Sequence, residues 1–301
     1  MTESIDNQIT HLTKLEITGL LGKYDIVWNL NPDVNVLAGG NGSGKSTILN
    51  SLYQALSVKS NIYSERLDHI KLFLNNGVWL RLKSFTIPDD EETSGKPKFE
   101  IKTNSPQQPP HELKKRINID FISTFDTEAK PLELLQKAGR HVQTELDWEL
   151  WLLQQEYTKY QVRIYKTNSE VNRATHIRFL AIIDELFLET HKRVNANKEE
   201  LAFLLDNKEI NTYQLSSGEK QLLIILLTVL IQDNKPFILF MDEPEISLHI
   251  EWQRKLIKYI RELNPNVQLI IATHSPDIIV HGWLDNVFNL QDLIVKDNTR
   301  L

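Results

Sequence analysis

The chain has 301 residues, of which 25% are charged and 41% are hydrophobic, and its formal net charge is -6. This length provides one large domain or two small ones with a substantial core, and the composition is ordinary for a globular protein. The negative charge argues against a surface devoted wholly to nucleic acid, and the lack of cysteine excludes disulfides, cysteine-ligated metals and a thiol nucleophile.

Neither a signal peptide nor a membrane span is predicted. Residues 1–13 are polar and contain no apolar stretch. The longest apolar run, residues 222–231, is interrupted by Thr228 and is too short to cross a bilayer. We therefore expect a soluble, cytoplasmic protein with no membrane partner.

The first third of the chain is predicted to be rich in strands. Apolar residues form short or alternating runs, and turn-forming residues separate these runs. A glycine-rich loop after the third run leads into a predicted helix with Ile48, Leu52 and Leu56 on one face. The expected strands span residues 15–18, 25–30, 34–38, 70–74, 78–82, 99–101 and 117–123.

The remainder is predicted to be helical and then alternating. From residue 131 to about 195, apolar residues recur at helical spacing, which favours two or three helices packed as a lid on a sheet. After this segment, strands and helices alternate, which predicts a parallel sheet covered by helices on both faces. The expected elements are a helix at 217–231, a strand at 237–241, a helix at 247–263 and a strand at 268–273.

A phosphate-binding loop is predicted between the third strand and the first helix. Residues 39–46 fit G-x-x-x-x-G-K-[ST] in the strand–loop–helix context that gives this pattern its meaning. Glycines allow backbone N–H groups to surround phosphates, and the helix N-terminus adds its dipole. We expect Lys45 to reach the β- and γ-phosphates and the Ser46 hydroxyl to bind Mg²⁺. The alternative is a simple glycine turn before a helix.

Two acidic residues end the apolar strand at 237–241. The carboxyl edge of a buried parallel strand lies beside the phosphate loop in such folds, so both carboxylates should project there. Asp242 is the expected holder of Mg²⁺, directly or indirectly, and Glu243 is the expected general base for the attacking water. The alternative is an acidic strand end or a helix cap.

Two further segments are predicted to lie near phosphate. Ser216, Ser217, Gly218 and Glu219 precede a buried helix; they form a good helix N-terminus and, with small residues and free N–H groups, a second anion site. His274 ends the last apolar strand at the same sheet edge as Glu243. It could bind the γ-phosphate or the attacking water, although a single histidine is often structural.

These motifs, in this order, resemble the ABC ATPase superfamily. Residues 41–47 resemble its Walker A loop, 215–221 its signature motif, 237–243 its Walker B strand and 273–275 its switch histidine, within a resemblance that spans about 15–290. The resemblance implies that ATP is bound by Asn41, Gly42, Ser43, Gly44, Lys45, Ser46 and Thr47, and by the signature residues Ser216, Ser217, Gly218 and Glu219.

The same resemblance implies an α/β P-loop NTPase head, in which a parallel core sheet is joined by an antiparallel β subdomain and a helical lobe. We expect a single ABC-type domain over residues 1–301. Its parts would be lobe I at about 1–130, a helical lobe or lid at about 131–210, and a half with the signature helix and Walker B at about 211–301.

The signature and the residues after Walker B resemble the non-transporter branch. Leu-Ser-Ser-Gly-Glu-Lys-Gln is typical of RecF-, SMC- and OLD-like ATPases, and residues 243–249 are similar to ATPases of OLD nucleases and of antiphage systems such as retrons, Septu and PARIS. In such families the signature of one subunit covers the ATP of the other. The resemblance thus implies a homodimer that encloses ATP and Mg²⁺, with residues 245–249 at the dimer seam.

The sequence departs from the family at one metal contact. The usual glutamine after the strand at 117–123 is missing, so either Asp126 takes its place as a metal ligand or the contact is absent. Lys23 and Tyr24 are candidates for contacts with the adenine base, or simple surface residues. The basic cluster at 114–116 is either a solvated surface run or a contact with DNA or phosphate.

We expect an enzyme that converts ATP and water to ADP and phosphate, and that switches a partner effector, such as a nuclease encoded nearby, in antiphage defence. The first alternative is a DNA-repair or DNA-maintenance ATPase that binds DNA directly, which leaves nucleic acid open as a partner. The second is a scaffold that binds ATP with slow turnover. A transporter subunit is disfavoured by Ser-Leu-His at 247–249.

Overall fold

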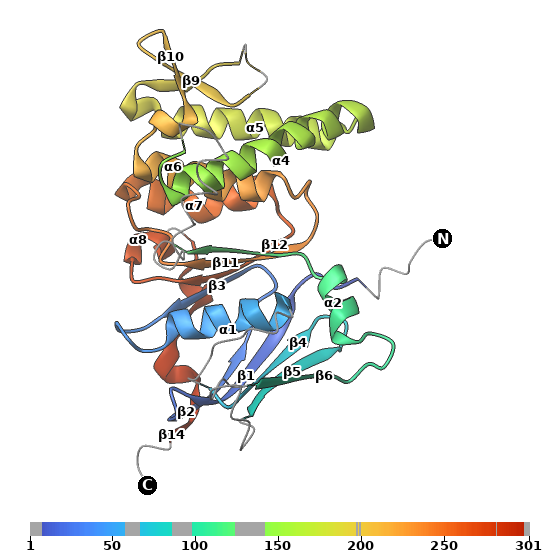
Figure 1. Ribbon diagram of the computed structural model, residues 1–301. Coiled ribbons are helices and arrows are strands. Elements are labelled where there is room, and N and C mark those ends of the chain that lie inside the picture. Colours follow the sequence, from blue (N-terminus) through green and yellow to red (C-terminus); the bar gives the residue numbers. More distant parts are fainter. Residues whose placement is uncertain are drawn as a thin grey trace.

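A computed structural model describes residues 8–57, 67–85, 98–123, 142–196, 198, 200–280 and 282–297. Figure 1 shows its elements in layers, with an antiparallel sheet at the bottom of the view, a parallel sheet in the middle and a group of helices above. No helix in these ranges has the length and apolar character needed to cross a membrane.

The parallel sheet forms the centre of the molecule. β11 and β12 are buried at every position, as expected for apolar strands that are covered on both faces. All neighbouring strands in this sheet are parallel, so their carboxyl ends meet at one edge. The strand order is β13 (Val287–Asn289), β3 (Val34–Ala38), β12 (Val267–Ala272), β11 (Phe237–Asp242) and β7 (Ile119–Ser123).

The antiparallel sheet faces the parallel sheet across helix α1 (Lys45–Ser57). Alternate residues of its strands are buried, so one face packs on α1 and the other faces solvent. A single apolar cluster joins both sheets and this helix. The strand order is β14 (Ile294–Asp297), β2 (Tyr24–Asn29), β1 (Leu12–Leu20), β4 (His69–Leu74), β5 (Trp79–Phe85) and β6 (Lys98–Thr103).

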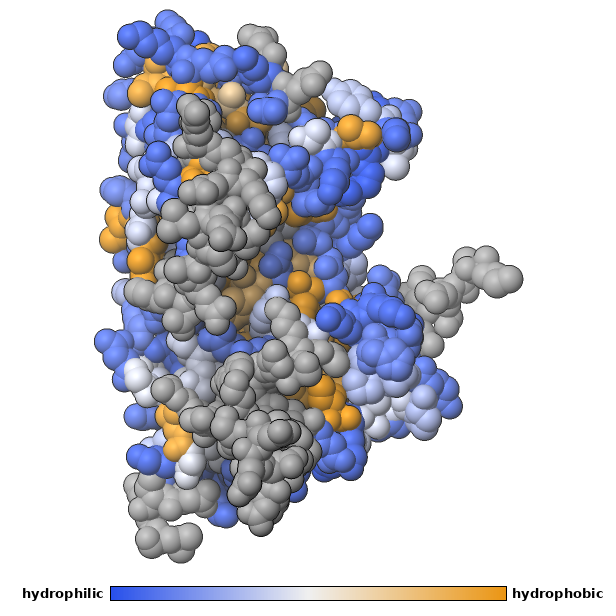
Figure 2. Space-filling view, viewed as in Figure 1, coloured by the Kyte–Doolittle hydropathy of each residue, from blue (hydrophilic) through white to orange (hydrophobic). Residues whose placement is uncertain are grey.

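Helices cover the other face of the parallel sheet. α6 (Ser217–Leu230) is buried along almost its whole length, because α4 (Glu145–Thr167) and α5 (Glu170–Leu186) lie over it and α7 (Ile250–Leu263) lies beside it. This burial explains the long apolar run in its sequence. Where residues are coloured, Figure 2 shows hydrophobic groups as small, separate patches among hydrophilic ones.

The structure corrects part of the helical prediction. Helix α5 ends at Leu186, and the chain then forms a three-stranded sheet from β8 (Lys192–Val194), β9 (Ala202–Leu205) and β10 (Lys208–Asn211). Positive φ values at Asp206 and Asn207 make the tight turn between β9 and β10. The helical prediction was therefore wrong beyond Leu186, and its part at 131–141 lies outside the described residues.

Other differences are smaller. The helix expected from residue 247 begins at Ile250, because Ser247 has φ +70° and cannot belong to a right-handed helix. Helix α2 (Pro110–Arg116), the short helix α8 (Pro276–Ile279) and strands β13 and β14 were not predicted. The expected strands at 99–101 and 117–123 correspond to β6 and β7.

Candidate nucleotide-binding and hydrolysis site

The predicted phosphate loop surrounds a cavity at the carboxyl edge of the parallel sheet, which is called the nucleotide cavity below. It joins the end of β3 to the start of α1, and φ values of +71° at Gly42 and +107° at Gly44 require the conformational freedom of glycine. The cavity has a volume of about 400 Å³. It is lined by Leu21, Asn41, Gly42, Ser43, Gly44, Lys45, Ser46, Thr47, Glu243, Ile246 and His274.

The Lys45 ammonium group lies at the base of this loop. Its Nζ donates to the carbonyl oxygens of Gly39 at 3.1 Å and Gly40 at 3.2 Å, and it lies 2.6 Å from His274 Nε2. Burial lowers the pKa of Lys45, and the carboxylates of Glu243 and Asp242 act in the opposite direction. Its contacts with Gly39, Gly40 and His274 fix the Lys45 side chain at the base of the loop.

Ser46 and Asp242 meet at the start of α1 and the end of β11. The Ser46 hydroxyl donates to Asp242 Oδ1 at 3.1 Å, and the side chain of Asp242 is buried. A hydroxyl beside a carboxylate fits Mg²⁺, which takes few protein ligands and completes its shell with phosphate and water. No group of three or more His, Cys, Asp or Glu residues in the described ranges could hold a metal ion.

The predicted metal ligand Asp126 lies outside the described residues. The chain enters that segment from Ser123, whose position in β7 pairs with Asp242 in β11. The structure thus describes the strand before Asp126 but not the residue itself, and its role stays a prediction.

Glu243 lies where the attacking water is expected. Its φ of +50° is unusual for a non-glycine residue, and its N–H is held by the Ala272 carbonyl at 2.8 Å. Its Oε1 lies 3.2 Å from His274 Nε2 and 4.0 Å from Lys45 Nζ. Burial, together with the neighbouring Glu245 carboxylate, raises the pKa of Glu243 to about 7. A carboxyl group with this pKa can gain and lose a proton near neutral pH.

The signature residues 216–219 form the N-terminus of α6, which is called the signature tip below. Ser216 and Glu219 make a capping box: Ser216 N donates to Glu219 Oε2 at 2.8 Å, and Glu219 N donates to Ser216 Oγ at 3.3 Å. The Glu219 side chain is fully buried and also binds Thr190 at 2.7 Å and Lys192 at 2.8 Å. Its carboxylate therefore stabilises the tip from inside, and its predicted contact with ATP stays a prediction.

The rest of the signature tip faces two ways. Ser216 and Ser217 are exposed, whereas Gly218 is buried so closely that an added Cβ would lie 2.2 Å from the Ser247 carbonyl oxygen. Ser217 lines a second, smaller cavity of about 140 Å³ together with Ile246 and Ser247, and it does not line the nucleotide cavity. Within one protomer, the two predicted phosphate sites are therefore separate.

The remaining candidates do not line the nucleotide cavity. Lys23 lies in the turn between β1 and β2 and Tyr24 begins β2, although their neighbour Leu21 does line the cavity. The basic cluster at 114–116 forms the last turn of α2, where Lys115 pairs with Glu112 at 2.8 Å.

One residue of the site was assigned no catalytic part from the sequence. Glu245 Oε1 accepts hydrogen bonds from Thr273 Oγ1 at 2.5 Å, His274 N at 3.0 Å and Ser275 N at 3.2 Å. The second acid of Asp-Glu-Pro-Glu at 242–245 was a signal for it, but only the fold shows that it faces the loop that carries His274.

The sequence of this chain is similar to a family model and to several known proteins. A family model described as "AAA domain, putative AbiEii toxin, Type IV TA system" matches residues 205–280. The Septu protein PtuA of Bacillus thuringiensis is 23% identical over 93% of this chain and 75% of that protein. The retron Ec83 probable ATPase of Escherichia coli is 29% identical over 31% of this chain, and the retron Vc95 probable ATPase of Vibrio cholerae is 28% identical over 27%. These alignments cover 19% and 18% of the two retron proteins.

Two solved structures share the fold over most of the chain. An Smc head bound to the C-winged helix domain of ScpA has a TM-score of 0.55 at 14% identity, and covers 90% of this chain and 92% of its own. An Smc head with an extended coiled coil, bound to the C-terminal domain of ScpA derived from Pyrococcus furiosus, has a TM-score of 0.53 at 15% identity over 91% and 92%. This chain thus has the α/β fold of an Smc-like ATPase head, and its sequence is related to the Septu protein PtuA and to the probable ATPases of two retrons.

Proposed function

We propose that this protein is a switch driven by ATP, which acts in the cytoplasm as a homodimer and controls a partner effector in antiphage defence. The observation that carries this proposal is the convergence of Lys45, Ser46, Asp242, Glu243 and His274 at one edge of the parallel sheet. These residues supply a phosphate anchor, a metal-binding pair, a base and a polar contact for the γ-phosphate.

The chain's own groups have distinct tasks in hydrolysis. Lys45 exchanges its contact with His274 for phosphate oxygens when ATP enters, and the loop N–H groups surround the phosphates. Ser46 and Asp242 would hold Mg²⁺, which would supply positive charge beside the phosphates. Glu243 orients the attacking water and accepts its proton, while His274 is left free to donate to a γ-phosphate oxygen.

The signature tip supports closure of two copies around ATP. Ser216 and Ser217 are exposed at the N-terminus of α6, where the helix dipole favours an anion. They do not line the cavity of their own protomer, so a second copy is the natural source of the phosphate. ATP drives closure because it is bound more tightly in the closed state.

Closure around ATP is tested by measuring mass in solution. The protein is mixed with Mg²⁺ and a non-hydrolysable ATP analogue and examined by light scattering after gel filtration. We expect a dimer with the analogue and a monomer for Lys45→Ala, which loses the phosphate anchor. A protomer that binds the analogue and stays monomeric would contradict the proposal.

Control of an effector is supported by the relatives in Septu and retron systems. We propose a nuclease encoded nearby as the partner, held inactive until a trigger arrives. The gene and its neighbours should protect a phage-sensitive host, and Lys45→Ala should abolish protection. The effector should also be recovered with the parent protein. Unchanged phage sensitivity and no recovered second protein would count against this part.

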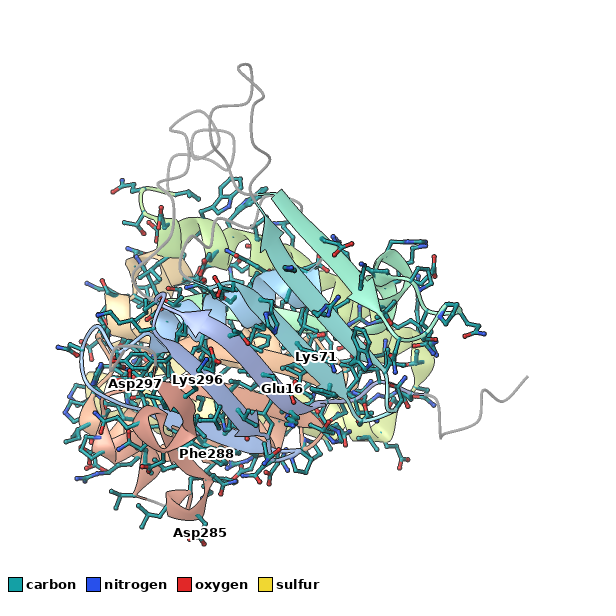
Figure 3. All side chains as sticks on the ribbon, turned by 90° about the horizontal axis from the view of Figure 1, so that it is seen from below. Glu16, Lys71, Asp285, Phe288, Lys296 and Asp297 are labelled. Carbon is teal, nitrogen blue, oxygen red and sulfur yellow. The ribbon has the colours of Figure 1, made fainter. Side chains whose placement is uncertain are left out.

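A second candidate function, direct binding of DNA, is favoured by the outer face of the antiparallel sheet. Figure 3 shows Glu16 and Lys71 on neighbouring strands of this face. The Lys71 ammonium lies 4.7 Å from the ring centres of both Phe73 and Trp79. On strands β1, β4, β5 and β6 of this face, cations outnumber the carboxylates Glu16 and Glu100, although the whole chain has a net charge of -6. These cations are Lys14, Lys71, Arg81, Lys83 and Lys102.

This candidate predicts binding to duplex DNA that weakens as salt rises. The double variant Lys71→Glu and Lys83→Glu should lose about tenfold in affinity, because it removes two phosphate contacts. Lys258→Glu, on the exposed side of α7, is the matched control and should bind like the parent. Undetectable DNA binding, or an affinity that does not change with salt concentration, would exclude this function.

A further inference from the structure

The segment from Glu243 to Ser247 connects the nucleotide cavity to the signature tip. Glu243 and Ser247 have φ values of +50° and +70°, so both ends are fixed in a conformation that side chains seldom adopt. Between them, Ile246 lines both the nucleotide cavity and the smaller cavity beside Ser217. A defined shape that touches both sites can carry a displacement from one to the other.

At one end of this segment, Glu245 holds the loop that carries His274. Its Oε1 accepts hydrogen bonds from the His274 and Ser275 N–H groups and from the Thr273 hydroxyl. A carboxylate that accepts several hydrogen bonds forms stronger bonds than a neutral acceptor. The position of the His274 backbone is therefore tied to Glu245, and this position brings its Nε2 within 3.2 Å of Glu243.

Gln253 of α7 makes a second tie between the same two segments. Its Nε2 donates to the Leu248 carbonyl at 2.9 Å and to the Glu245 carbonyl at 3.4 Å, and its Oε1 accepts from Ser275 Oγ at 2.7 Å. The segment after β11 and the loop after β12 thus share one network on a helix. They should move as a unit.

At the other end, the signature tip rests on Ser247. A Cβ on Gly218 would lie 2.2 Å from the Ser247 carbonyl oxygen and 3.7 Å from the Trp252 ring. This contact leaves no space between the tip and the segment. Displacement of the tip toward Ser247 must therefore displace that residue, because packed groups cannot be compressed.

We propose that Glu245 is a positioning residue that transmits contact at the signature tip to His274. The inference rests on the proposed function, in which the tip of one copy meets the ATP of another. Engagement of the tip moves Ser247, and Glu245 and Gln253 carry that movement to the loop at Thr273–Ser275. His274 in one protomer thereby responds to the nucleotide held by its partner, which couples the two ATP sites of the dimer.

The first test is structural and needs no activity. Histidine side chains are labelled with ¹³C and ¹⁵N, and the His274 signal is assigned by its loss in His274→Asn. Glu245→Ala should shift or broaden the His274 signal, because it removes the hydrogen bonds that hold the loop. Glu262→Gln, at the far end of α7, should leave the signal in place. An unchanged His274 signal in Glu245→Ala would overturn the proposal.

The second test separates positioning from nucleotide binding. Glu245→Ala should lower kcat about 30-fold while KM for ATP changes less than about threefold, since Glu245 does not line the nucleotide cavity. Glu245→Gln should recover most of kcat, because its carbonyl oxygen still accepts the backbone N–H groups. A KM that rises as much as kcat falls, or a glutamine variant no better than alanine, would argue against positioning.

The third test examines transmission from the tip. Ser217→Arg obstructs the exposed tip, and it is combined with Glu245→Ala. If both act through one connection, the double variant should lose about as much kcat as the more damaging single variant. If the fold losses in kcat of the two single variants multiply in the double variant, the proposed transmission is overturned. If the parent shows no hydrolysis, the proposed function fails, while the His274 signal still decides whether Glu245 holds this loop.

Discussion

The nucleotide cavity and the signature tip are both predicted to bind phosphate, but the fold prepares them in opposite ways. In the cavity, Lys45 contacts His274 and Ser46 contacts Asp242, so protein groups already occupy the positions that ligands would take. At the tip, Ser216 and Ser217 face solvent while Glu219 anchors them from below. This difference supports the proposal that the chemistry belongs to one protomer and that its control depends on a second.

The sharpest test of the cavity is Glu243→Gln. The amide cannot accept a proton from water, so kcat should fall about 1,000-fold while ATP remains bound and the dimer persists. Phosphate release and gel filtration with ATP measure both effects. If the variant hydrolyses ATP like the parent, Glu243 is not the base.

The tip is tested by Ser217→Arg. The bulky charged side chain should keep the tip from a nucleotide on another copy and lower kcat about 100-fold, as loss of donors to a transition state does. ATP binding to the isolated protomer should be unchanged, because Ser217 does not line its cavity. Gln155→Arg on the exposed side of α4 is the control. If Ser217→Arg hydrolyses ATP as fast as the parent, the signature tip has no role in hydrolysis.

The pH dependence of hydrolysis gives a third test of the cavity. The pKa of Glu243 is raised to about 7, so its carboxyl group is protonated below that pH and cannot act as a base. We expect kcat to rise about tenfold per pH unit up to about pH 7 and then to level off. Initial rates across this range are compared with those of Glu243→Gln, which should lack the acid limb. A flat profile for the parent would contradict this assignment.

The smallest expected effect concerns the support of the tip. Gly218→Ala places a Cβ 2.2 Å from the Ser247 carbonyl oxygen, which should lower the free energy of unfolding by about 1–3 kcal/mol. Urea denaturation followed by circular dichroism measures this change. Gly40→Ala is the matched control, since a Cβ there meets nothing within 4 Å. Equal stability of the two variants would show that the tip is not tightly packed on Ser247.

The predicted fold class is confirmed, and most predicted strands and helices of the two sheets are present with shifted ends. The errors have local causes. Strands β9 and β10 form through an Asp206–Asn207 turn, a weak signal after a strongly helical segment. Glu219, assigned to ATP because it belongs to the signature motif, is buried and pairs with Lys192, and its assignment stays a prediction.

The sequence by itself determined the local chemistry: left-handed glycines in the phosphate loop, an acidic strand end and a capped helix tip each arise from a few adjacent residues. Tertiary structure decided which of these groups meet. Parallel pairing of β3, β12 and β11 brings Lys45 to His274 across 229 residues, and close packing sets Gly218 on Ser247. Such contacts depend on strand order and side-chain packing across the whole fold, which local residue patterns do not specify.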